Sequence, residues 1–377
     1  MEELRNKLNE IDDEIVKLYL KRMEVVADIG KEKDLKRLPI TSGKREKEVL
    51  DRITASATPE MKKYLTMLYQ TIFETSKAYQ TNFTSKDTKL TAEIKSKLLD
   101  GYKKFPTSAA VAVQGVEGAY SESAARRIFE DASLSFCNSF ESVFRAVDKG
   151  LCKYGVLPID NSTFGTVGRV YDLLNEYKFY IVKSVKLEIK HSLLAKAGVE
   201  LKDIKEVISH EQAIGQCAEF IEKSGLKVTL VQNTAVAAET VANSDRNDIA
   251  AIASAECASI YGLKVLKSGI QNEEENYTRF ICISKDLELY EDANRISLVL
   301  GLPHKSGSLY RTLSRFSALN LNLTKLSSRP VAGTEFEYLF YLDFESNVAK
   351  NEALSIIAEL DNECESFAFL GSYQEIA

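Results

Sequence analysis

The 377-residue sequence has few of the residues that build metal, disulfide or membrane-spanning sites. It contains three histidines and no tryptophan, and its six cysteines stand singly without a CxxC pair. This spacing argues against a zinc knuckle and a disulfide framework, so no metal site is predicted and each cysteine is expected to be a small buried hydrophobe in a reducing cytoplasm. No apolar run approaches the roughly 20 residues of a membrane span, and the N-terminus has no signal-peptide pattern.

The sequence also lacks the glycine fingerprint GxGxxG that a nicotinamide-dependent enzyme would need. Its formal net charge of -6 disfavours a nucleic-acid surface, although local basic clusters could hold a small acidic metabolite. With 45% hydrophobic and 28% charged residues, the composition is that of a soluble globular protein. A chain of this length exceeds one ordinary hydrophobic core, and we predict three domains.

The first predicted helix, residues 4–33, carries an arginine within an apolar stripe. The stripe steps by four and three residues, as in a helix face packed against other helices, through Leu4, Leu8, Ile11, Ile15, Leu18, Val25 and Ile29. Arg22 occupies the missing step, and Lys33 lies on its face about three turns later. Because no acid of this helix lies on the stripe, we infer that a ligand supplies the anion that meets Arg22.

Residues 1–84 are predicted to be helical, with helices over 4–33, 42–53 and 59–82 and breaks at 38–39 and 57–59. A helix of some 30 residues is about 45 Å long, too long for a three-helix domain to cover, so we expect a dimer. Arg5 lies about 100° around the helix from Arg22 and could reach the same pocket only from a partner chain.

Polar residues of the second and third helices complete the expected pocket. They are Ser42, Arg45, Glu46, Ser76 and Gln80. Each residue alone is more ordinarily part of a solvated helix face, and Ser42 is also a good N-cap. Together with the cations of the first helix, they suit a small dianion that carries a hydroxyl.

These residues resemble the all-helical chorismate mutase family, which folds as an intertwined dimer. The matching segments are Leu4-Arg5, Lys21-Arg22, Gly30-Lys31-Glu32-Lys33, Arg45-Glu46, Glu74-Thr75-Ser76 and Gln80. The resemblance implies that the arginines clamp the two carboxylates of chorismate and that Glu46 meets the ring hydroxyl. It further implies that Lys33 and Gln80 donate to the ether oxygen. A unimolecular rearrangement of this kind needs no cofactor. Ser42 stands where the family often has Asp.

Residues 85–107 read as a linker with a short helix near 92–99. From residue 109, strand-length apolar runs alternate with helical segments, which predicts an α/β fold. Polar loops at 115, 160, 209 and 278 follow strands or lead into them, as at the cleft of a two-lobed domain whose second lobe spans about 191–266. Turn and capping chemistry is the alternative for these loops, and the spacing of Ser209 and Gln212 fits a capping box.

Residues 108–285 resemble prephenate dehydratase, a two-lobed α/β fold like that of periplasmic binding proteins. The matching segments are 118–121, 158–162, 234–238, 261–263 and 278–280, with Asp160 where the family commonly has Glu. The resemblance implies that Thr278 is catalytic and that Arg279 lies beside it. Threonine is a poor acid, so Thr278 is expected to donate a hydrogen bond or relay a proton. Further cleft residues are expected at Asn161, Thr163, Ser209, His210 and Gln216; His210 is a second possible donor or a histidine satisfied at a helix start.

Residues 294–374 show the order strand, helix, two strands, helix, strand, which is typical of a ferredoxin-like α+β domain. The strands are expected at 295–300, 321–327, 337–344 and 366–371. This segment resembles the amino-acid-binding ACT domain, which implies phenylalanine as an effector held by Gly307, Leu309, Ser328, Arg329 and Pro330. Ser308, Tyr310 and Ser327 depart from the family's motifs.

The predicted protein is therefore a bifunctional chorismate mutase/prephenate dehydratase with an ACT domain, which takes chorismate to phenylpyruvate. Its partners would be these small molecules and a second copy of the chain. One alternative is a ligand-sensing regulator whose helical domain grips a protein or DNA; the helices lack helix-turn-helix spacing, which disfavours it. Another alternative keeps one of the two activities and has lost the other.

Overall fold

The computed structural model describes residues 1–36, 38, 40, 42–81, 87–273, 275–305, 307–330 and 338–376. The chain divides into two compact units, one of Met1–Gly101 with Leu298–Phe369 and one of Tyr102–Ser297 with Leu370–Ala377. This division differs from the predicted borders at 285 and 294, because the chain crosses between units within two strands, β12 (Arg295–Gly301) and β15 (Ser366–Ile376). Four features of the prediction lie outside the described residues: Pro39, Asn82, the linker start at 85–86 and Glu337.

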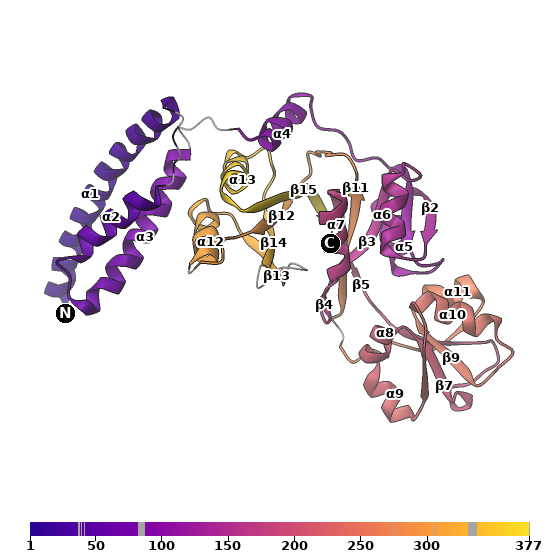
Figure 1. Ribbon diagram of the computed structural model, residues 1–377. Helices are drawn as coiled ribbons and strands as arrows, with labels where there is room; N and C mark the ends of the chain where they lie inside the picture. The colour runs from indigo at the N-terminus through magenta and orange to yellow at the C-terminus, as the bar shows by residue number, and fades with distance from the viewer. Residues whose placement is uncertain are drawn as a thin grey trace. The chain divides into compact units, whose positions relative to one another are not determined.

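The first unit begins with the predicted helices, α1 (Glu2–Leu35), α2 (Gly43–Thr54) and α3 (Pro59–Thr81), followed by α4 (Lys89–Leu99). The predicted helical N-terminal domain is confirmed (Figure 1). Within α1, the buried residues are Val26, Ala27 and Gly30. A β-carbon on Gly30 would lie 3.2 Å from Cγ of Gln80, so this glycine lets α1 and α3 approach closely.

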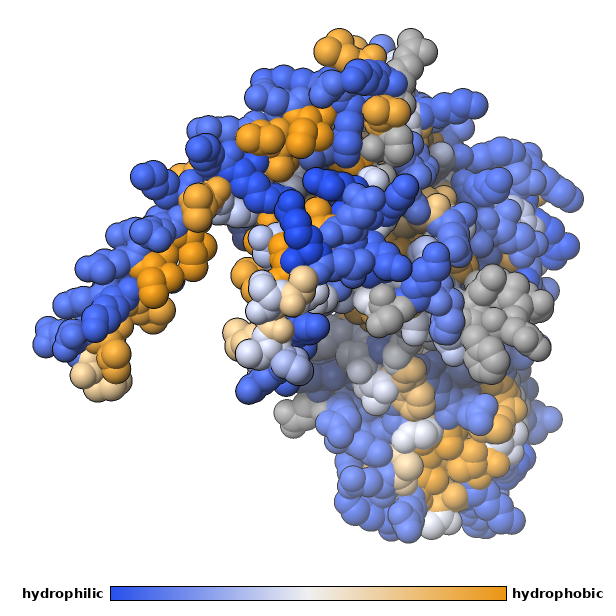
Figure 2. Space-filling model, turned by 60° about the vertical axis from the view of Figure 1, so that its left-hand side comes forward, coloured by the Kyte–Doolittle hydropathy of each residue, from blue (hydrophilic) through white to orange (hydrophobic). Residues whose placement is uncertain are grey.

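The apolar stripe of α1, predicted to pack against other helices and to be covered in a dimer, is exposed in the single chain. The side chains of Leu4, Leu8, Ile11, Ile15, Leu18, Val25 and Ile29 are 41–66% exposed. Figure 2 shows apolar residues, in orange, along the N-terminal helical part of the first unit. The helix packs inside the unit through the neighbouring face of Val26 and Gly30, which are buried, while the stripe remains largely exposed.

The remainder of the first unit follows the predicted order: β12, α12 (Ser308–Ala318), β13 (Leu323–Pro330), β14 (Tyr338–Glu345), α13 (Asn351–Glu363) and β15. The strands are arranged β13-β14-β12-β15. Phe316 of α12 meets Phe344 of β14 edge to face, with 5.2 Å between ring centroids. This contact and the buried Ile356 and Ile357 of α13 form the core under the sheet.

The second unit has two lobes, as predicted. The first-lobe sheet runs β5-β11-β3-β1-β2, with β4 (Gly165–Thr166) at β3. Its strands are β1 (Ser108–Gln114), β2 (Asp131–Cys137), β3 (Tyr154–Asn161), β5 (Tyr180–Glu188) and β11 (Tyr277–Ser284). Its helices are α5 (Tyr120–Ile128), α6 (Phe140–Asp148) and α7 (Gly168–Tyr177). Parallel strands β1, β2 and β3 form one side of this sheet, as βα alternation requires.

The second lobe carries a sheet in the order β10-β6-β9-β7-β8. Its strands are β6 (Ser192–Ala195), β7 (Glu206–Ser209), β8 (Lys227–Leu230), β9 (Ile249–Ala253) and β10 (Lys264–Ser268). Its helices are α8 (Glu211–Gln216), α9 (Ala218–Ser224), α10 (Thr234–Asn243) and α11 (Glu256–Tyr261). The chain then returns to the first lobe as β11, which pairs antiparallel with both β3 and β5. This return brings the 278 loop beside the 160 loop.

The last residues of β15 belong to the second unit, where Gln374–Ile376 pair in parallel with Lys183–Val185 of β5. Gly371 lies just before this pairing with φ +144°, and a β-carbon there would lie 2.1 Å from the carbonyl oxygen of Ile181. Only glycine fits such a close approach of two backbones.

Cys152, Cys217, Cys257 and Cys282 are buried, as predicted, whereas Cys137 and Cys364 are half-buried. In the part of the chain that the structure describes, no helix combines the length and apolarity needed to cross a membrane.

Candidate active sites

The helical cluster of the first unit is built around Arg22. Its Nη1 donates to Oγ of Ser76 over 2.5 Å, and this hydroxyl in turn donates to the carbonyl of Ile72 over 2.5 Å. Ser76 is 5% exposed, while Arg22 is half-buried at the edge of the face that packs on α3. A guanidinium held by a neutral hydroxyl keeps its full charge available for an anionic ligand.

Lys33, Glu46 and Gln80 lie in the same part of this unit. The Lys33 ammonium donates to the carbonyl of Ile40 over 2.5 Å, and burial lowers the pKa of Lys33 while the nearby Glu46 carboxylate opposes this shift. Gln80 is 7% exposed, and its Oε1 is buried without a hydrogen-bond partner among the described residues. Gln80 thus lies buried where α1 and α3 meet, next to Gly30.

Three predicted residues are not drawn into this cluster. Arg5 is exposed near the start of α1, and Arg45 is exposed and pairs with Glu48 at 3.2 Å. Ser42 is the N-cap of α2, as predicted, but its side chain makes no capping hydrogen bond.

Lys77 is a member of the cluster that the sequence reasoning missed. Its ammonium lies 3.0 Å from Oε1 of Glu46 and 2.9 Å from Oε1 of Glu74. The i, i+3 spacing of Glu74, Lys77 and Gln80 along α3 was a signal that these residues share a face.

A cavity of about 210 Å³ opens between the two lobes of the second unit. Both lobes line it, with Asn161, Thr278 and Phe280 from the first and His210, Gln216 and Asn233 from the second. The predicted cleft residues Asn161, His210, Gln216 and Thr278 therefore come together here. The cleft wall also includes His191, Tyr120 and Gln114.

Asn161 organises the first-lobe wall of this cleft. Its Nδ2 donates to Oγ1 of Thr278 over 2.9 Å and to Oδ1 of Asn276 over 2.9 Å. Its Oδ1 accepts from the backbone N–H groups of Thr163 and Phe164 at 3.0 and 2.9 Å. Because the Thr278 oxygen already accepts from Asn161, the Thr278 hydroxyl proton is free to donate to a bound molecule.

Two histidines lie on the second-lobe side of the cleft. His210 is the N-cap of α8, where its Nδ1 accepts from the N–H of Gln212 over 3.2 Å, so the capping residue is the histidine rather than Ser209. His191 is 2% exposed, and its Nε2 lies 2.6 Å from Oε1 of Gln216. Burial lowers the pKa of His191, which favours the neutral ring, and its Nδ1 has no partner among the described residues.

Three predicted cleft residues do not line the cavity. Arg279 donates to Oδ2 of Asp160 over 2.7 Å, on the strand face opposite Thr278, because successive residues of a strand point to opposite sides. The Ser209 hydroxyl donates to the carbonyl of Ile252 over 2.6 Å inside the second lobe. Thr163 contributes its backbone N–H to Asn161.

Comparison with known proteins gives a family to the N-terminal helices of the first unit and to the two lobes of the second. Residues 4–81 match the family model of type II chorismate mutase, and residues 111–288 match that of prephenate dehydratase. The bifunctional chorismate mutase/prephenate dehydratase of Escherichia coli is 32% identical over 381 residues, covering 98% of this chain and 95% of that protein.

The chain belongs to this bifunctional family. It joins a chorismate mutase to a prephenate dehydratase, which decides between an enzyme and a ligand-sensing regulator in favour of the enzyme. The helical cluster is hereafter called the mutase site, and the interlobe cavity the dehydratase cleft.

Two further relatives cover the dehydratase part. An arogenate dehydratase/prephenate dehydratase of Arabidopsis thaliana is 39% identical over 275 residues, covering 70% of this chain and 72% of that protein. The solved structure of a prephenate dehydratase from Arthrobacter aurescens, in complex with L-Phe, is 27% identical with a TM-score of 0.64, covering 70% of this chain and 89% of that one. This structural match extends the likeness beyond sequence to the fold.

The predicted effector residues lie on two elements of the first unit. Gly307 is the N-cap of α12 in the left-handed conformation, with φ +79°, and Leu309 is half-buried in the first turn. Ser328, Arg329 and Pro330 end β13, opposite Phe340, Leu339 and Tyr338 of β14.

Asn161→Asp tests the role of the Asn161 amide. The aspartate keeps an oxygen acceptor for the two turn N–H groups but cannot donate to Thr278. We expect the dehydratase kcat to fall about 100-fold, because Thr278 would turn its proton toward the carboxylate instead of the substrate. Steady-state formation of phenylpyruvate measures this, with the mutase activity of the same preparation as the control. Wild-type dehydratase activity in the variant would contradict the role.

Proposed function

We propose that the chain rearranges chorismate at the mutase site and then decarboxylates and dehydrates the resulting prephenate in the dehydratase cleft, in the cytoplasm and without a cofactor. The observation that carries the proposal is the hydrogen bond from Asn161 to Thr278, a residue that lines the cleft, because it leaves the Thr278 hydroxyl proton available to a departing hydroxyl group. The grouping of Arg22, Lys33 and Gln80 supports the first step.

The mutase step needs a compact conformer and a stabilised ether oxygen. Arg22 would hold a carboxylate of chorismate, oriented by its bond to Ser76. Lys33 and Gln80 would donate to the ether oxygen as its bond to carbon breaks and negative charge develops there. Glu46 would accept from the ring hydroxyl. Such preorganised donors lower the barrier because they are already oriented when the charge appears.

The dehydratase step breaks two bonds of prephenate. The ring carboxylate leaves as carbon dioxide, its electron pair enters the ring, and the ring hydroxyl departs with its own bonding pair as the ring becomes aromatic. Thr278 would donate its hydrogen bond to this departing oxygen, which takes up a proton from solvent and leaves as water. The neutral His191 and Gln216 would face the polar groups of the substrate from the other lobe.

A second copy of the chain would cover the exposed stripe of α1. Seven large apolar side chains on one helix face are 41–66% exposed, a surface that water disfavours. Antiparallel pairing of two such helices would bring the partner's α1 start toward the mutase site. Arg5, which is exposed near the start of α1, would then supply a cation to the neighbouring pocket.

The domain formed by β12, α12, β13, β14, α13 and β15 would be an ACT domain, with borders near 294 and 374. Its element order and its strand order fit the ferredoxin-like arrangement. Phenylalanine would bind at the start of α12, with Gly307 and Leu309, and at the end of β13. The L-Phe complex of the Arthrobacter aurescens relative supports this effector.

Two single variants separate the two activities. Arg22→Ala should slow chorismate consumption at least about 100-fold, because a carboxylate clamp is lost, while added prephenate is still converted. Thr278→Ala should leave chorismate consumption intact and slow the conversion of prephenate. Chorismate loss and phenylpyruvate formation are followed separately in the purified protein, with arogenate as a third substrate.

Intact chorismate consumption in Arg22→Ala would overturn the mutase assignment. Intact phenylpyruvate formation in Thr278→Ala would overturn the catalytic role of that threonine. A wild-type protein that performs one reaction only would establish that the other activity has been lost.

The shared mutase site predicts complementation between inactive chains. Arg5→Ala and Arg22→Ala homodimers should each be inactive, whereas a mixed dimer has one pocket with both arginines intact. Random exchange of subunits in an equal mixture should restore about one quarter of the wild-type mutase activity. Mixed dimers purified through two different tags, but without activity, would contradict the shared site.

Phenylalanine should inhibit the dehydratase, and Leu309→Ala should raise the concentration needed for half inhibition about tenfold, because an apolar contact to the effector is lost. The exposed Leu326, on β13 outside the proposed binding residues, gives the matched control Leu326→Ala. Titration of activity with phenylalanine, and sizing of the protein with and without it, provide the measurement. An enzyme indifferent to phenylalanine in both assays would refute the effector proposal.

A further inference from the structure

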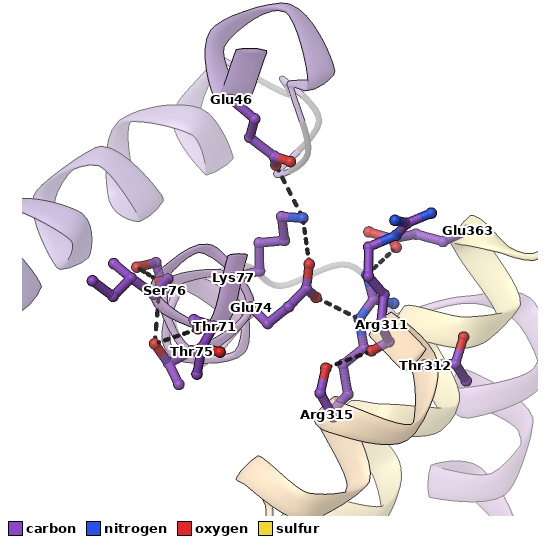
Figure 3. Close-up of polar contacts among 12 residues, drawn as sticks. Glu46, Thr71, Glu74, Thr75, Ser76, Lys77, Arg311, Thr312, Arg315 and Glu363 are labelled. Atoms are coloured by element: carbon purple, nitrogen blue, oxygen red, sulfur yellow. Dashed lines mark hydrogen bonds and ion pairs between the residues drawn. The ribbon is translucent and has the colours of Figure 1, made fainter. Parts of the chain in front are cut away.

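A row of buried ion pairs runs from α12 to the mutase site within the first unit (Figure 3). Nε of Arg315 on α12 lies 3.2 Å from Oε2 of Glu74 on α3. The other oxygen of Glu74 lies 2.9 Å from Nζ of Lys77, and Lys77 lies 3.0 Å from Glu46 on α2. Four charges of alternating sign therefore connect the neighbouring helices α2 and α3 with α12, although Arg315 and Glu74 are 241 positions apart in the sequence.

The inner members of this row are shielded from water. The side chains of Glu74, Lys77 and Arg315 are 5%, 8% and 8% exposed, whereas Glu46 at the open end is 28% exposed. Burial strengthens the attraction between such charges and makes an unpaired one costly, so removing one member forces the others to rearrange. Arg315 is also held from α13 by Glu359 at 3.1 Å and Glu363 at 2.6 Å, which fix its position.

Lys77 is shared between two carboxylates, and Arg315 determines how it is shared. With Arg315 in place, Glu74 has a second cation, and Lys77 can hold Glu46. Without Arg315, Glu74 would be a buried carboxylate with Lys77 as its one remaining partner in the row, and it would draw the ammonium away from Glu46. The Glu46 side chain would then lose the contact that sets its direction.

We propose that Arg315 is a positioning residue for the mutase reaction, acting through Glu74 and Lys77 on Glu46. This inference rests on the proposed role of Glu46 toward the ring hydroxyl of chorismate. It makes a helix outside the mutase fold part of the mutase's machinery. When a catalytic carboxylate is already held in one direction, less free energy is spent on orienting it in the transition state.

The test is a double-mutant cycle in the full-length enzyme. Arg315→Met should lower the mutase kcat/KM about tenfold in the wild-type background and leave it unchanged in a Glu46→Gln background, because Arg315 acts only through that carboxylate. Arg315→Lys, which restores a cation, should recover part of the loss. Arg52→Met removes an exposed arginine from α2, away from the row, and serves as the charge-matched control.

If Arg315→Met lowers the mutase kcat/KM by the same factor in both backgrounds, or in neither, the inference is overturned. If Glu46→Gln alone retains wild-type mutase activity, the proposed role of Glu46 fails first and the inference falls with it. Circular dichroism and thermal unfolding of each preparation report whether the helical first unit is folded, and the dehydratase activity reports the same for the second unit. If Arg315→Met does not fold, Glu74→Gln takes its place in the same cycle, with the same two readings.

Discussion

The rule that a buried charge must be met by an opposite charge governs both units of this protein. Arg315 and Arg279 are nearly inaccessible to water, and each lies among carboxylates that come from distant segments of the chain. Such pairs contribute little net stability compared with apolar packing, but they cannot be broken singly without a large penalty. They therefore specify which helix or strand lies beside which, and the active sites inherit their geometry from that choice.

The Arg22–Ser76 contact shows the complementary case. The Arg22 guanidinium is hydrogen-bonded to a hydroxyl, which can hold it in place without neutralising its positive charge. The sequence argument that a cation in an apolar stripe implies an anion singled out this residue, and its role toward a ligand stays a prediction. Periodicity could not say what covers the stripe, because it reports that a helix face is apolar but not whether the covering surface belongs to the same chain.

Local patterns predicted the helices, the two lobes and the βαββαβ order, because each depends on spacing within a short window. They failed where the site depends on contacts across the sequence. Asn276 meets Asn161 from 115 positions away, and His191 reaches Gln216 from a neighbouring loop. Arg279 was placed in the cleft by its adjacency to Thr278, although the strand pleat sends the two side chains to opposite faces. Family resemblance supplied the cleft's identity where periodicity could not.

The C-terminal strand has a consequence for how this protein can be divided. Residues Gln374–Ile376 pair with β5, and the Glu375 carboxylate forms ion pairs with Arg295 at 2.8 Å and with Arg279 at 3.5 Å. A chain shortened at residue 285 would bare the edge of β5 and leave Arg279 with one carboxylate fewer. The dehydratase domain therefore cannot be separated at residue 285: a strand more than 80 residues farther along the chain completes its sheet, and a truncated or fused version must retain that strand to keep this edge paired.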